Sequence, residues 1–278
     1  MKRRFFLLSL VTLAPLIAFG VLALAGVVAQ SLSSPQPFAL RLVAGACLAA
    51  IAISIASNYR RLDQSRNVIA RHFAEDVLNT VRPHSILLVK GDGLAFPLIY
   101  LQKVEKAGSD TTLVVIPLLL GDWYVRQLRE QHPDLVVPFD HYDPQTNNLK
   151  LFVEANQGRP TEVAGPVGDD HSLEADYWPY QQGLLVQVTP KSQNVPLERL
   201  LLENEQLLGR CHPPAPERVH WNTFEADILN VYTYAPFSVA GSCEQTGLIA
   251  EARKWYERTL AINPQFSKAH DALARLEH

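Results

Sequence analysis

The chain contains few cysteines and, beyond its N-terminal segment, an excess of acidic over basic residues. Its three cysteines show no Cys-x-x-Cys or other metal-binding spacing, and Cys211 and Cys243 can either pair or stay free. The formal net charge is −3, but residues 1–61 carry six basic and no acidic residues, so the remainder has a net charge of −9. An acidic soluble part argues against a nucleic-acid partner, because such a surface requires a basic patch.

Charged residues are also scarce in two long apolar segments near the N-terminus. Phe5 to Ala29 is a 25-residue stretch without a charge, and about 20 apolar residues are enough for a helix to cross a bilayer. A cleaved signal peptide has a shorter apolar region, although "VVAQS" offers a cleavage site after Ala29. The second segment, residues 38–57, has a single charge, Arg41, near its end. We therefore predict a transmembrane helical hairpin over residues 1–60 and a location in the cell membrane.

The flanking charges predict the orientation of this hairpin. Basic residues lie at both of its outer ends, and the connecting region contains only Arg41. The positive-inside rule then places both ends, and with them the soluble part, in the cytoplasm. In the second segment, Ala46, Ala50 and Ser54 recur at a spacing of four, which can let two helices approach closely.

Residues 61–195 alternate between helical and strand-like patterns. "SILLVK" is a continuous apolar run typical of a strand covered on both faces, and Thr111 to about Leu118 predicts a second one. Between them, Pro97 suits the first turn of a helix, and Asp122 suits the N-cap of the next. The alternation predicts a small α/β domain with a parallel sheet core. "LKLFVEA", "TEVAG" and "GLLVQVTP" are further strand candidates.

Residues 196–278 have a helical pattern with a tetratricopeptide-like cadence. Ala252, Tyr256, Leu260 and Pro264 occupy the small, aromatic, apolar and helix-ending positions of that repeat. The preceding segment would complete a helix pair, although Pro236 interrupts it. A single repeat cannot bury a core alone, so we expect this segment to pack on the α/β domain or on a partner.

One stretch between residues 70 and 128 follows a recognisable family pattern. The matching positions are Gly91, Asp92, Phe96, Pro97, Leu98, Tyr100, Leu101 and Gln102, followed by Asp122, Trp123, Tyr124, Gln127 and Leu128. This stretch resembles the C-terminal region of the multi-pass protein O-mannosyltransferase (transmembrane protein 260-like) family, which includes bacterial relatives. The resemblance implies a GT-C-type transferase that uses a lipid-linked sugar and carries its catalytic acids in an N-terminal multi-pass half.

That catalytic half has no counterpart in this sequence. The resemblance therefore implies a C-terminal third, as part of a split gene, a truncated fragment or a degenerate paralogue, without catalysis of its own. We expect it to bind an acceptor protein or a separate transferase subunit. The resemblance also suggests an extracytoplasmic soluble domain, which we favour over the cytoplasmic placement given by the charge rule.

The candidate ligand-binding residues lie in two turns. Gly91, Asp92 and Gly93 follow the first predicted strand, where α/β folds bind ligands. The family has three polar residues where this chain has Gly93, Leu94 and Ala95, so we interpret the turn as inherited rather than as a working site. The second turn contributes Asp122, Trp123 and Tyr124. The two aromatic residues could stack on a sugar, but packing on the sheet is the favoured interpretation.

An alternative function combines both turns. In it, the Asp92 turn, Trp123 and Tyr124 form a carbohydrate-binding or glycosyltransferase domain. The segments "DHYD" (residues 140–143) and "DDH" (residues 169–171) contain metal-type residues, but their spacing does not bring them together and solvated charges explain them. We predict no metal, no cofactor and no catalytic residue.

Overall fold

The computed structural model describes residues 6–33, 35–146, 148–165, 171–193 and 195–277. The chain forms two compact units, Met1–Asn67 and Val68–His278. The predicted domain boundary after residue 60 stays a prediction. The division of the remainder near residue 195 stays a prediction.

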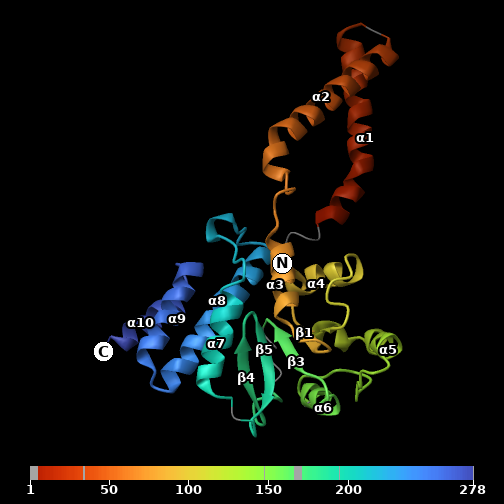
Figure 1. The fold of residues 1–278 in the computed structure, drawn as a ribbon. Coiled ribbons are helices and arrows are strands. Elements are labelled where there is room, and N and C mark those ends of the chain that lie inside the picture. Colours follow the sequence, from red (N-terminus) through yellow and green to blue (C-terminus); the bar gives the residue numbers. More distant parts are fainter. Residues whose placement is uncertain (1–5, 34, 147, 166–170, 194, 278) are drawn as a thin grey trace. The chain divides into compact units, whose positions relative to one another are not determined.

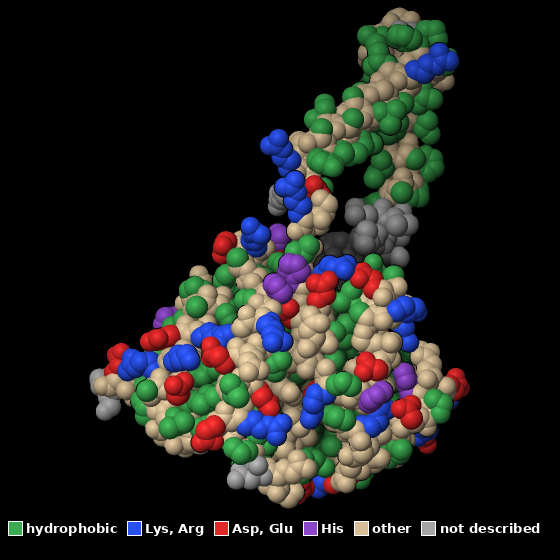
Figure 2. All heavy atoms as spheres, in the orientation of Figure 1, with side chains coloured by type: hydrophobic (Ala, Val, Ile, Leu, Met, Phe, Trp, Pro, Cys, Tyr) green, Lys and Arg blue, Asp and Glu red, His purple; other side chains and the backbone are tan. Residues whose placement is uncertain are grey.

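The first unit consists of two helices, α1 (Phe6–Ser31) and α2 (Gln36–Leu62), which pack against each other. Both are long and apolar enough to cross a membrane, and hydrophobic side chains are exposed along the length of this hairpin (Figure 2). In α2 the buried positions are Ala39 and Val43, whereas Ala46, Ala50 and Ser54 are exposed. The small-residue stripe predicted from spacing is therefore not the face that contacts α1.

The second unit is built around a five-stranded sheet (Figure 1). Its strands are β1 (Ile86–Val89), β2 (Thr112–Val115), β3 (Thr161–Ala164), β4 (Tyr177–Gln182) and β5 (Leu185–Pro190), in the order β2-β1-β3-β5-β4. β1 pairs in parallel with β2 and β3, and β5 pairs antiparallel with β3 and β4. The predicted parallel core is confirmed for three strands, but the β4–β5 hairpin makes the sheet mixed.

Helices cover both faces of this sheet. α3 (Ile69–Thr80), α4 (Asp92–Lys103) and α5 (Asp122–Gln131) alternate with the first strands, and α6 (Asn148–Ala155) precedes β3. The chain passes from β1 through α4 to β2, then back across β1 through α5 and α6 to β3. Because such crossovers are right-handed, α4 lies on one face and α5 and α6 lie on the other.

The remaining helices form a layer beside the sheet (Figure 1). They are α7 (Leu197–Leu208), α8 (Phe224–Gln245), α9 (Ile249–Ile262) and α10 (Ser267–Leu276). α8 contacts α3, α4 and β4, and α9 packs between α8 and α10. Ala252, Tyr256 and Ala269 are buried, as their predicted core role requires. α8 continues through Pro236 without a break. A tetratricopeptide arrangement is not confirmed.

Two local predictions of secondary structure are wrong, and one strand was missed. "LKLFVEA" forms α6 rather than a strand, because its buried residues Leu149, Phe152 and Val153 follow helical spacing. The second strand ends at Val115, and a short 3₁₀ segment η1 (Ile116–Leu120) follows, since Pro117 cannot donate to a sheet ladder. β4 was not among the predicted strands; it contains Pro179, which is tolerated because β4 is an edge strand.

Two helix starts also differ from the sequence-based expectation. α4 begins at Asp92, so Pro97 lies inside the helix rather than in its first turn. α5 has Gly121 as its N-cap and Asp122 as its first helical residue. The three cysteines are free thiols.

Candidate functional site

The Gly-Asp-Gly turn after β1 has a structural cause for each glycine. Gly91 is the N-cap of α4 and has φ of +105°, a conformation that side chains with a Cβ rarely adopt. A Cβ on Gly93 would lie 2.5 Å from the Cβ of Phe224, at the start of α8. Asp92 is exposed in the first turn of α4, where a carboxylate interacts favourably with the helix dipole. Helix start and close packing therefore explain this turn without a ligand.

A first groove, which we call the strand-end groove, lies beside this turn. Its volume is about 580 Å³, and it lies between the carboxyl ends of β1 and β3, the β4–β5 hairpin and α8. Gly91 lines it through the backbone, whereas Asp92 and Gly93 do not. Most of its lining is apolar, and its polar side chains include Lys90, Asp227 and Asn230.

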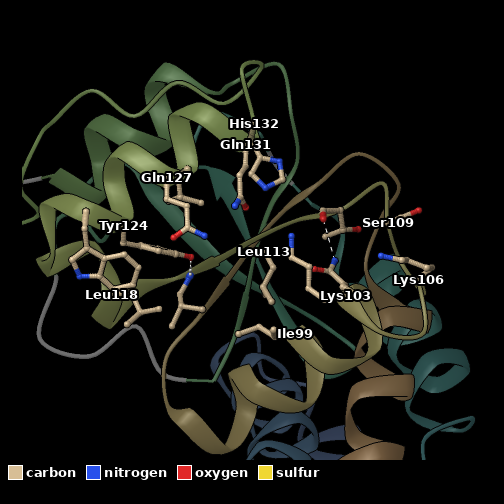
Figure 3. Close-up of a pocket in the computed structure, with 15 residues that line it drawn as sticks. Ile99, Lys103, Lys106, Ser109, Leu113, Leu118, Tyr124, Gln127, Gln131 and His132 are labelled. Carbon is tan, nitrogen blue, oxygen red and sulfur yellow. Dashed lines mark hydrogen bonds between the residues drawn. The ribbon is translucent and has the colours of Figure 1, made fainter.

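A second groove, which we call the α4–α5 groove, opens over the outer edge of β2 (Figure 3). Its volume is about 400 Å³. In Figure 3 the labelled residues of α4 and those of α5 lie on opposite sides of Leu113. The lining consists of Ile99, Gln102, Lys103 and Lys106 from α4 and the loop after it, Ser109, Thr111, Leu113, Val115 and Leu118 from β2 and its flanks, and Trp123, Tyr124, Gln127, Leu128, Gln131 and His132 from α5 and its end.

Trp123 and Tyr124 play different roles in the α4–α5 groove. The Tyr124 side chain is buried, and its hydroxyl accepts a hydrogen bond of 3.0 Å from the backbone N–H of Val115. Burial raises the pKa of Tyr124, so the phenol stays neutral. Trp123 is 55% exposed and packs edge-on against the Tyr124 ring at 5.6 Å. Tyr124 thus fixes the sheet edge, while the indole of Trp123 stays open to a ligand.

The α4–α5 groove has a positive electrostatic character. Lys103 and Lys106 are exposed on its wall and form no ion pair with a described residue, and no described carboxylate lines the groove. Burial, with a contribution from the charge of Lys103, lowers the pKa of His132 and keeps its imidazole neutral at pH 7. The neighbouring Glu105 forms an ion pair with Arg71, with an Nη1–Oε1 distance of 2.8 Å.

The structure therefore separates the predicted site residues. Trp123 and Tyr124 line the α4–α5 groove, Gly91 lines the strand-end groove, and Asp92, Gly93 and Asp122 line neither. The carboxylate of Asp122 lies 3.2 Å from Nδ1 of His141 on the surface. The polar residues of the α4–α5 groove that were not singled out from the sequence as site candidates are Gln102, Lys103, Lys106, Ser109, Thr111, Gln127, Gln131 and His132. Of these, Gln102 and Gln127 belonged to the family pattern, which was the available signal.

The metal-type segments have ordinary surface partners. Asp140 pairs with Arg129 at 2.7 Å, and His141 lies beside Asp122. Asp169 and Asp170 lie outside the described residues. Within the described part of the chain, no group of three or more His, Cys, Asp or Glu side chains could hold a metal ion.

Comparison with known proteins places the α4–α5 groove inside a family domain. The sequence model of TMEM260-associated domain 2 matches residues 70–148, which include every residue that lines this groove. This chain is a relative of the TMEM260 family. The mouse protein named Protein O-mannosyl-transferase TMEM260 is 28% identical to it over 142 residues, which cover 47% of this chain and 20% of the mouse protein. The match thus spans about a fifth of the length of that TMEM260 protein. No solved structure matches the chain significantly.

Proposed function

We propose that this TMEM260 relative is a membrane-anchored, polypeptide-binding module of a protein O-mannosyl-transfer system. It binds an acceptor polypeptide or a separately encoded multi-pass transferase subunit and does not transfer sugar alone. The name of the mouse relative and the two apolar helices support this setting.

The observation that carries the proposal is the composition of the α4–α5 groove. It combines the exposed indole of Trp123, the amides of Gln127 and Gln131, and an apolar floor. Exposed tryptophans are typical anchors of protein interfaces, and side-chain amides satisfy the backbone of a bound chain. The groove also lies wholly within the segment shared with the TMEM260-associated domain.

A selection experiment tests this proposal. The full chain, reconstituted in lipid nanodiscs, is used to enrich binders from a random displayed peptide library. Enriched peptides are then measured against the Trp123→Ser variant. Loss of an interface tryptophan costs about 2 kcal/mol or more, so we expect affinity to fall at least roughly thirtyfold.

Trp178 provides a matched control. It is 56% exposed, nearly the same as Trp123, but it lies on β4 away from the α4–α5 groove. Trp178→Ser should leave peptide affinity unchanged. If no peptide is enriched, or if both variants bind equally well, the groove is not a polypeptide site.

A second candidate function is carbohydrate binding through Trp123. An exposed indole beside the Gln127 amide also suits stacking on a sugar ring. Titration with mannose oligosaccharides, followed by tryptophan fluorescence, separates the two candidates. Saturable quenching that disappears in Trp123→Ser would favour the sugar, whereas the proposal predicts no saturation.

A further inference from the structure

The outer edge of β2 exposes backbone groups inside the α4–α5 groove. β2 is an edge strand whose ladder partner is β1. The N–H of Thr112 donates to the carbonyl of Ser85, so Thr112 faces β1. In a parallel ladder alternate residues face opposite sides, so the backbone groups of Leu113 and Val115 point outward, away from β1. The hydrogen bond from Val115 N–H to the Tyr124 hydroxyl agrees with this direction.

Side chains close both ends of this edge and leave its centre open. Tyr124 takes the N–H of Val115, and Nε2 of Gln102 donates to the carbonyls of Gly108 and Thr111 at 2.9 and 3.0 Å. Among the described residues, none forms a hydrogen bond with the outward N–H or C=O of Leu113. α4 and α5 border the opening on either side. The opening thus offers one donor and one acceptor at strand spacing.

The charges around this opening specify what can occupy it. Lys103 and Lys106 face the groove without carboxylate partners among the described residues. The nearby acids Glu105 and Asp134 are paired with Arg71 and Arg159, and Asp110 does not line the groove. A negatively charged segment is therefore attracted, and a basic one is repelled. An edge strand in a groove binds an extended chain through main-chain hydrogen bonds.

We propose that an extended, acidic polypeptide segment binds in the α4–α5 groove by pairing with the backbone of Leu113 at the open edge of β2. Its carboxylates lie beside Lys103 and Lys106, and Trp123 packs against its side chains. This inference rests on the proposed function and adds the conformation and charge of the bound polypeptide.

The test uses the peptides enriched from the random library on the full chain in nanodiscs. We expect the enriched pool to be richer in Asp and Glu than the starting library. The double variant Lys103→Glu/Lys106→Glu should bind the tightest peptide roughly tenfold more weakly, because it replaces two attractive rim charges by repulsive ones. The double variant Lys191→Glu/Arg210→Glu makes the same change in net charge elsewhere and should bind as the wild type does.

Hydrogen exchange tests the backbone pairing directly. Exchange of the Leu113 amide should slow when peptide is bound, because its N–H then has a partner. Leu113→Pro removes this N–H without removing a bond to β1, and it should abolish peptide binding. If Leu113→Pro does not fold, the exchange measurement on the wild-type chain still decides.

The outcomes separate this inference from the proposed function. Peptides that need Trp123 but are neutral or basic, or that leave Leu113 unprotected, would overturn the inference alone. Absence of any Trp123-dependent peptide would overturn both. Protection of Leu113 that rises with the concentration of the chain itself, without peptide, would assign the edge to a second copy and overturn the acidic-segment proposal.

Discussion

At the residue scale, Asp76 holds together segments that are far apart in the sequence. This buried carboxylate on α3 accepts hydrogen bonds from the hydroxyl of Tyr232 at 2.6 Å and from the backbone N–H of His212 at 2.6 Å. Its other oxygen lies 2.9 Å from Nδ1 of His212. The hydrogen bond to Asp76 raises the pKa of His212, while burial raises that of Tyr232 and keeps the phenol neutral.

The His212–Asp76 contact predicts a pH dependence of stability. The pKa of His212 is higher in the folded state than in the unfolded state, where it is about 6.5. Its contribution to the free energy of unfolding is therefore complete at pH values below the unfolded pKa and is lost as pH rises through the folded pKa. His212→Gln should therefore lower the melting temperature more at about pH 5.5 than at about pH 8.5. Thermal unfolding of the full chain in detergent, followed by tryptophan fluorescence, measures this, because all four tryptophans lie beyond residue 67. An equal decrease at both pH values would contradict it.

Gly93 gives a second prediction at this scale. Gly93→Ala places a methyl group against Phe224, so we expect a loss of about 1–3 kcal/mol in the free energy of unfolding from overpacking. Gly241→Ala, in α8, is the matched control because a Cβ there meets nothing within 4 Å. That change should stabilise by up to about 1 kcal/mol through helix propensity. Urea denaturation measures the free energy of unfolding of both variants. If the two substitutions change it by the same amount, the close contact of residue 93 with Phe224 does not destabilise the variant.

At the scale of elements, an ion pair fixes β3 to the end of α3. Glu162 on β3 is fully buried, and Arg82 lies 2.7 Å from its carboxylate. The backbone N–H of Arg82 also donates to Glu162. Burial raises the pKa of Glu162, while Arg82 opposes the increase. A central strand thus carries a buried carboxylate for which Arg82 supplies the compensating positive charge.

Removing Arg82 should destabilise the second unit in a pH-dependent manner. Because the folded pKa of Glu162 is above the unfolded one, its contribution to stability decreases as pH rises through the folded pKa. Without Arg82 the folded pKa rises further, so Arg82→Ala should cost about 3 kcal/mol at neutral pH and less at about pH 5. Arg253→Ala, which breaks an exposed pair with Glu277, should have little effect. A loss that does not depend on pH would argue against an uncompensated Glu162 charge.

At the scale of the whole molecule, the two units suit different environments: the first suits a lipid bilayer and the second suits water. α1 and α2 present apolar surface, whereas the second unit buries its apolar residues around the sheet. We predict that the full chain stays in the membrane fraction after alkaline carbonate extraction. A chain that lacks residues 1–62 should move to the soluble fraction. Retention of that shortened chain would indicate a further membrane contact on the second unit.

The side of the membrane is a separate prediction. The relation to the multi-pass transferase family favours an extracytoplasmic second unit, while the positive-inside rule applied to these two helices predicts the opposite. We expect alkaline phosphatase fused after His278 to be active. If the phosphatase fusion is inactive and a fusion to green fluorescent protein at the same position fluoresces, the second unit lies in the cytoplasm.

The sequence by itself determined the apolar hairpin, the buried strands β1 and β2 and the family relation, because these depend on local runs of residue types. It did not determine α6 or β4, whose short patterns are ambiguous until neighbouring elements cover them. Only the tertiary structure decided which residues line the α4–α5 groove. It showed that Gly93 faces Phe224 and that Gln102 and Tyr124 leave Leu113 open, since these contacts join residues from different elements that no sequence spacing relates.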